Sequence, residues 1–97
     1  MITEADLLAK VPRGLYIDGA WVDAEGGRTL AVTDPSTGQT LVEIADASVA
    51  DGQRAMDAAA NAQAAWAATA PRARGEILRR AFDLLQERAD EFALLMT

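Results

Sequence analysis

The sequence has 97 residues, enough for one small domain or for part of a larger one. Hydrophobic residues make up 51% and charged residues 25% of the chain, which is ordinary for a soluble globular protein. The formal net charge of -6 argues against nucleic acids and anionic membrane surfaces as partners, because both attract basic surfaces.

Cysteine and histidine are both absent, which excludes disulfides, thiol nucleophiles and His-based catalytic triads within this sequence. A zinc site would have only carboxylate ligands, which is unusual. The N-terminal stretch MITEADLLAK opens with acidic residues and has no basic n-region, so no signal peptide is predicted. We therefore expect a cytoplasmic protein. The longest apolar runs are far shorter than the ~20 residues of a membrane-spanning helix.

A short helix is predicted near the N-terminus, over about residues 4–10. Thr3 and Asp6 have the spacing of a capping box, in which a hydroxyl and an acid three residues later satisfy the first free backbone N–H groups. Pro12 is expected to end this helix, because the residue before a proline avoids the helical region.

A first β-hairpin is predicted around Asp18-Gly19, which lies between strands at residues 15–17 and 20–22. Asp-Gly readily adopts the positive φ angles of a two-residue type I′ turn, and the twist of that turn matches the flanking strands. Residues 24–27 are expected to form a looser connection to the next strand.

A second hairpin is predicted around the stretch VTDPSTGQTL, with strands at residues 29–33 and 40–44. Pro35 suits the first central position of a turn, Gly38 suits its end, and the Asp34 side chain can accept hydrogen bonds from the backbone ahead of it. The stretch lacks the glycine spacing and the Gly-Lys-Ser/Thr ending of a phosphate-binding loop, so a chain reversal is preferred over an anion site.

A long helix is predicted from Ser48, which forms a second capping box with Asp51, to about Ala68. Alanine, the strongest helix former, dominates this run. Trp66 is expected to pack in a core, and a stacking platform for a ligand is the alternative. The shallow face of this helix carries residues at i, i+4 and i+7 spacing, namely Ala55, Met56, Ala59, Ala62 and Trp66.

A further helix is predicted to begin near Pro71, whose missing N–H costs nothing at the first helical position. Asp90 is expected to cap a last short helix, unless the preceding helix only kinks there. The apolar stripe of the longer helix follows the helical period and comprises Ile77, Leu78, Ala81, Leu84 and Leu85, with Phe82 extending it. The fold class is therefore α+β: a short N-terminal helix, two β-hairpins, then two to three α-helices.

Arg72 and Arg74 lie near a predicted helix N-terminus, which attracts anions, so they are candidates for an anion site. A solvated face of mixed charge is the preferred interpretation of both residues. The sequence contains no G-x-G-x-x-G fingerprint, and no carboxylate pair has apolar surroundings that would separate two pKa values. The residues alone therefore assign no catalytic, cofactor-binding or metal-binding residue.

Three stretches together resemble the aldehyde dehydrogenase superfamily. YIDGAWVDAEGGRTLAVTDPSTGQTLVEIADAS resembles the hairpins near the N-terminus of that family, AMDAAANAQAAWAAT resembles its first long helix, and RGEILRRAFDLL resembles the helix after it. The resemblance covers nearly the whole chain, from about Leu15 to Thr97. The stretches LLAKVPRGLYIDG and FALLMT look most like the succinate-semialdehyde dehydrogenase branch.

The resemblance implies that residues 1–97 are an N-terminal, incomplete portion of an NAD(P)-binding domain within an α/β fold. The family oxidises an aldehyde to an acid through a cysteine thiolate, hydride transfer to NAD or NADP, and a glutamate-activated water. The family's catalytic and cofactor-binding residues all lie beyond position 97, so none is assigned to this chain. In some members, backbone carbonyls near the equivalent of Val32-Thr33 help to hold a monovalent cation.

The first functional hypothesis is an N-terminal enzyme fragment that is inactive by itself and derives from an enzyme that converts succinate semialdehyde to succinate. The second is a standalone interaction module that pairs with itself or with a related full-length subunit. The third is a small-molecule binder that uses Arg72 and Arg74. Under the first two, the apolar helix faces need a partner, either the rest of an enzyme or another copy, because exposed apolar patches favour association.

Overall fold

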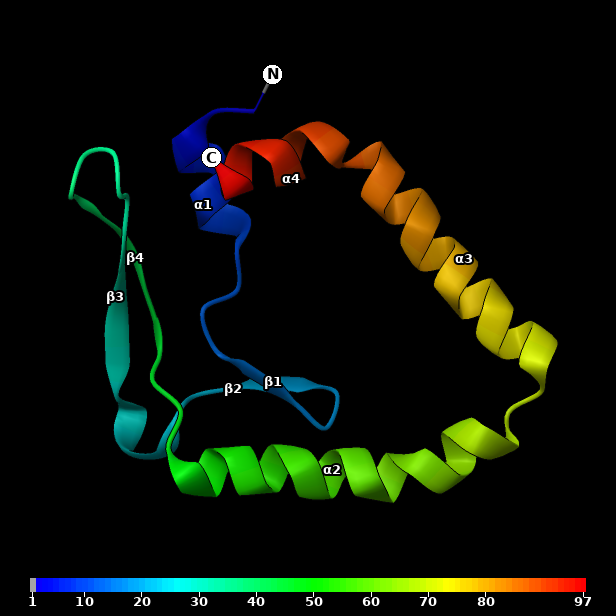
Figure 1. Ribbon diagram of the computed structural model, residues 1–97. Helices are drawn as coiled ribbons and strands as arrows, with labels where there is room; N and C mark the ends of the chain where they lie inside the picture. The colour runs from blue at the N-terminus through cyan, green and yellow to red at the C-terminus, as the bar shows by residue number, and fades with distance from the viewer. Residues whose placement is uncertain (1) are drawn as a thin grey trace. The chain divides into compact units, whose positions relative to one another are not determined.

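The computed structural model describes residues 2–97, and its elements confirm the predicted α+β class. Contacts divide the chain into two compact units: residues 11–61, and residues 1–10 together with 62–97. Figure 1 shows the elements in chain order: α1 (Glu4–Lys10), β1 (Leu15–Ile17), β2 (Ala20–Val22), the 3-10 turn η1 (Glu25–Gly27), β3 (Thr29–Thr33), β4 (Thr40–Ala45), α2 (Val49–Ala68), α3 (Pro71–Glu87) and α4 (Ala89–Met96).

The first hairpin is confirmed, since β1 and β2 pair antiparallel around Asp18 and Gly19. These two residues have φ angles of 52° and 78°, the left-handed values that a type I′ turn requires. Tyr16 lies opposite Trp21, and their ring centroids are 4.9 Å apart at an interplanar angle of 56°. Both rings are exposed, so this aromatic pair stabilises the hairpin on its outer face.

The second hairpin is also confirmed, with β3 and β4 paired antiparallel. The Asp34 carboxylate accepts a hydrogen bond from the Ser36 N–H at 2.9 Å, and the Asp34 carbonyl accepts one from the Gly38 N–H at 2.7 Å. Gly38 has a φ of 73°, which glycine adopts without strain. The stretch VTDPSTGQTL is therefore a hydrogen-bonded chain reversal, as its residues predict.

In the unit that contains both chain ends, α1 packs beside α4 (Figure 1). The Asp6 N–H donates to Thr3 Oγ1 at 3.1 Å, so the predicted N-terminal cap is confirmed. Leu7 is buried with 7% of its surface exposed, and Lys10 pairs with Glu91 at 3.6 Å. These contacts join the first helix to the last one.

The junction between α3 and α4 differs from the predicted Asp90 cap. The N-cap of α4 is Arg88, whose φ of -110° and ψ of 21° leave the helical region, and Asp90 lies in the first turn instead. The Arg88 N–H still donates to the Leu84 carbonyl at 3.2 Å, so one non-helical residue separates the two helices. An acid in the first turn is itself favourable, because the N-terminus of a helix carries partial positive charge.

Few side chains are buried. Among the described residues, only Leu7, Ala24 and Asp51 count as buried. The predicted burial of Trp66 is wrong for this structure, where the side chain is 41% exposed, because α2 presents it on a face that nothing in its own unit covers completely. Four large apolar residues of α3 are exposed as well, namely Ile77, Leu78, Phe82 and Leu85, whereas Leu84 is half-buried. The helices therefore form without a closed core. No helix of residues 2–97 is long and apolar enough to cross a bilayer.

Candidate functional site

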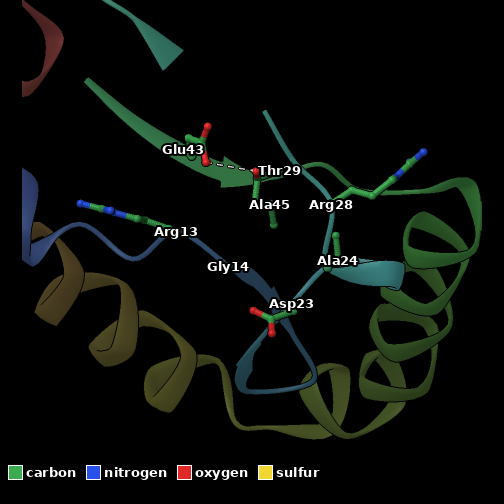
Figure 2. A pocket seen from close by; sticks show the side chains of 9 residues that line it. Arg13, Gly14, Asp23, Ala24, Arg28, Thr29, Glu43 and Ala45 are labelled. Carbon is green, nitrogen blue, oxygen red and sulfur yellow. Dashed lines mark hydrogen bonds between the residues drawn. The ribbon is translucent and has the colours of Figure 1, made fainter. Parts of the chain in front are cut away.

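The residue 11–61 unit contains a small pocket of about 140 Å³ between the segment before β1 and the start of β3 (Figure 2). Two backbone hydrogen bonds join the segments that carry its lining residues, from the Ala45 N–H to the Arg13 carbonyl at 2.8 Å and from the Asp46 N–H to the Arg28 carbonyl at 2.9 Å. The residues that line it are Arg13, Gly14, Asp23, Ala24, Gly27, Arg28, Thr29, Glu43 and Ala45.

The charged residues of this pocket do not converge on a common point. Figure 2 shows the Arg13 and Arg28 side chains extending in opposite directions, while Glu43 accepts a hydrogen bond from Thr29 Oγ1 at 3.3 Å. Arg28 pairs with Asp46 at 4.0 Å. Small-molecule sites usually enclose roughly 300–1,000 Å³. The pocket is therefore a packing crevice and not a substrate site.

A larger, open groove of about 470 Å³ lies between the first hairpin and α2 in the same unit. Two of its charged residues already have local partners: Arg54 pairs with Asp51, and Asp57 accepts a hydrogen bond from Gln53 Nε2 at 3.1 Å. The lining residues are Ile17, Asp18, Ala20, Val22, Arg54, Asp57, Ala58 and Asn61. Among the described residues, no hydrogen bond or ion pair joins two of these lining side chains, so the groove holds no assembled acid–base pair.

Asp51 is the best-connected side chain of the unit and is only 1% exposed. Its Oδ2 accepts hydrogen bonds from the Ser48 N–H at 2.9 Å and from the Glu25 N–H at 3.0 Å, and Arg54 pairs with Oδ1. The Asp51 N–H donates in return to Ser48 Oγ at 3.1 Å, which completes the predicted capping box. The contact with Glu25 is an addition that fastens η1 to the start of α2, so residues 24–27 are a fixed turn rather than a loose connection.

The same contacts lower the pKa of the Asp51 carboxyl far below its ordinary value. The backbone hydrogen bond from Ser48 is the largest cause, followed by the one from Glu25, because each stabilises the ionised form. The pKa of Asp34 is lowered as well, first by the Ser36 hydroxyl and then by the Ser36 amide. Both carboxylates therefore stabilise local structure, because the groups that donate hydrogen bonds to them belong to nearby parts of this chain.

We predict that the unit loses stability in acid. The folded state binds fewer protons at Asp51 than the unfolded state, so the contribution of this group is complete above about pH 4 and declines as the pH falls further towards the folded-state pKa. Urea unfolding between pH 7 and pH 2, for the parent and for Asp51→Asn, measures this effect. The difference in stability between the two proteins should shrink below about pH 4. A constant difference across that range would contradict the assignment.

The candidate anion residues are not brought together into a site. Arg72 pairs with Glu76 at 3.4 Å, which supports the preferred interpretation of a solvated, mixed-charge face. Arg74 differs, because its Nε is buried and has no hydrogen-bond partner among residues 2–97. The same residues contain no group of three or more acidic side chains placed to hold a metal ion.

Comparison with known proteins identifies relatives that are much longer. The chain is 44% identical over 82 residues to the glutarate-semialdehyde dehydrogenase of Pseudomonas aeruginosa strain PAO1, a match that covers 84% of this chain and 17% of the relative. It is similar to the crystal structure of PnpE in complex with nicotinamide adenine dinucleotide, with 39% identity, a TM-score of 0.83, and coverage of 88% of this chain and 18% of that one.

A second solved structure, the gamma-glutamyl-gamma-aminobutyraldehyde dehydrogenase of Burkholderia cenocepacia J2315, is 40% identical with a TM-score of 0.81. This match covers 97% of the present chain and 20% of that one. The fold described above is thus that of the N-terminal part of aldehyde dehydrogenase structures, in agreement with the resemblance seen in the sequence. The profile described as the aldehyde dehydrogenase family matches residues 21–97, and the chain therefore belongs to this family.

Proposed function

We propose that this chain is the N-terminal segment of the coenzyme-binding domain of an NAD(P)-dependent aldehyde dehydrogenase, and that it is inactive by itself. The observation that carries the proposal is the TM-score of 0.83 over 88% of this chain but only 18% of the longer structure. A likeness of that extent supports the proposal that the chain folds as one part of a larger domain. The NAD bound in that structure supports NAD as the coenzyme of the complete enzyme.

The proposed substrate is a short aldehyde that carries a carboxylate at its other end. The resemblance points to succinate semialdehyde, and the relative from Pseudomonas aeruginosa is a glutarate-semialdehyde dehydrogenase. The two aldehydes differ by one methylene group, and a hydrophobic pocket discriminates such a difference by only roughly 10- to 200-fold. The proposal therefore names this class and includes both aldehydes.

In such an enzyme the coenzyme accepts the hydride that leaves the aldehyde carbon. Residues 1–97 contain no cysteine, so in the proposed enzyme the thiolate nucleophile of the family must come from residues outside this sequence. The residues present in this chain contribute structure: Asp51 fixes the start of α2, and the Asp34 turn reverses the chain between β3 and β4. Their effect on catalysis is indirect, through the position of the segment.

A chimera tests the structural part of the proposal. This chain replaces the matching N-terminal segment of the Pseudomonas aeruginosa glutarate-semialdehyde dehydrogenase, and formation of reduced coenzyme is followed with glutarate semialdehyde. We expect activity within an order of magnitude of the parent enzyme, and no turnover by the isolated chain or by the enzyme with the segment deleted. Turnover by the pure isolated chain, or an insoluble and inactive chimera, would overturn the proposal.

The substrate class is tested on the polypeptide that the coding region encodes if it continues past codon 97. That protein should reduce NAD or NADP with succinate and glutarate semialdehydes, and lack of turnover with both would contradict the class.

The alternative function is a non-catalytic interaction module that pairs with itself or with a related full-length subunit. The exposed apolar residues of α3 favour it, and a stop codon together with stable cellular product would support it.

A further inference from the structure

One side of α3, here named the α3 apolar face, carries four large hydrophobic side chains that remain in contact with solvent. Ile77 is 55%, Leu78 66%, Phe82 49% and Leu85 51% exposed. They follow one another at helical spacing and form one surface. Full burial of one such side chain contributes roughly 1.5–3 kcal/mol of favourable free energy. An exposed surface of this kind therefore normally has a partner.

Arg74 shares this face, because Ile77 and Leu78 are three and four residues further along the helix. The other three arginines of α3 are paired within the helix: Arg72 with Glu76 at 3.4 Å, Arg79 with Asp83 at 3.4 Å, and Arg80 with Glu87 at 3.9 Å.

Arg74 has no acid within reach on its own helix, since the positions four residues before and after it are Ala70 and Leu78. Its Nε is nevertheless buried and has no hydrogen-bond partner among the described residues. A guanidinium group is always charged, so covering the α3 apolar face without an acceptor would bury an unpaired charge at high cost.

We propose that the α3 apolar face docks against the body of an aldehyde dehydrogenase polypeptide, and that this body places a carboxylate opposite Arg74. The inference rests on the proposed function. Chains of similar fold are about five times as long as the part that matches this one, so they hold the surface needed to cover the face.

A second copy of the chain fits this face less well. A two-fold dimer through the same surface would bury the Arg74 side chains of both copies. The acids of α3 that such a dimer brings along already pair with Arg72, Arg79 and Arg80. Two like charges would then be desolvated together, which is unfavourable. The charge pattern therefore favours a different surface, one that is apolar with an acidic residue at a single position.

The direction in which Arg74→Leu shifts the thermal midpoint of the chimera described above tests the proposal. Arg74→Leu makes the α3 apolar face fully hydrophobic but leaves the facing carboxylate unpaired, so the thermal midpoint should fall by on the order of 3 °C or more. Arg74→Lys, which keeps the charge, should recover part of this loss. Arg72→Leu is the matched control, because the Arg72 side chain is 92% exposed, and it should shift the midpoint by about 1 °C or less.

A midpoint that is unchanged or raised by Arg74→Leu would overturn the proposal, since it would show that no acceptor faces Arg74. An active chimera with that result would leave the proposed function intact, whereas an inactive, insoluble chimera would defeat both. Sedimentation of the isolated chain adds a second arm. Self-association that Phe82→Ser abolishes would assign the face to a second copy and would also overturn the inference.

Discussion

Asp51→Ala is expected to destabilise the residue 11–61 unit strongly. The substitution removes the acceptor for the backbone N–H groups of Ser48 and Glu25 and leaves Arg54 without its partner. Buried donors without acceptors are costly, so the thermal midpoint should fall by on the order of 10 °C. Circular dichroism measures the midpoint, and amide hydrogen exchange should quicken at Glu25 and Ser48 in particular.

Asp57→Ala provides the matched control on the same helix. Asp57 is exposed, and among residues 2–97 its side chain accepts a hydrogen bond only from the Gln53 side chain, at 3.1 Å. Its removal should change the midpoint by about 1 °C or less. Similar losses for the two substitutions would show that Asp51 does not fasten η1 to α2.

The second large effect is expected for Gly14→Ala. A Cβ atom at this position would lie 2.8 Å from the Val22 carbonyl oxygen and 3.4 Å from its carbonyl carbon. Both atoms belong to the backbone at the end of β2, so relief of the clash requires the hairpin to move. Crowding of this kind costs about 1–3 kcal/mol, which urea unfolding can measure.

Gly52→Ala should have the opposite sign. A Cβ atom added at Gly52 meets nothing within 4 Å, and the residue lies within α2, where alanine is preferred over glycine. The expected gain is about 0.5–1 kcal/mol. If both glycine substitutions stabilised the protein, the predicted clash between a Cβ at Gly14 and the Val22 carbonyl would be contradicted.

Features that are fixed by residues close together in sequence could be predicted from the sequence. The Asp18-Gly19 turn and the Asp34 turn each depend on side chains within a few positions, and both turns lie where those residues predict them. The Ser48–Asp51 cap is equally local. Such elements follow from dihedral preference and from short hydrogen bonds, so distant parts of the chain do not alter them.

Features that depend on distant residues could not be predicted. The bond from the Glu25 N–H to Asp51 spans 26 residues, and a capping box alone gives no sign of it. The expected burial of Trp66 required a covering surface that its own unit does not supply. The sequence shows Arg74 only as a charge near a helix N-terminus. The structure distinguishes it from Arg72, because the Arg74 Nε is buried without a hydrogen-bond partner among residues 2–97, whereas Arg72 pairs with Glu76.

The bond between Glu25 and Asp51 also bears on the order in which the polypeptide acquires structure. The loop that it closes is short, and the entropy lost on closing a loop grows only slowly with length, so this contact is inexpensive to form. Both hairpins of the residue 11–61 unit are likewise made of near neighbours. These residues can therefore order during translation, while the ribosome is still adding α3 and whatever follows it.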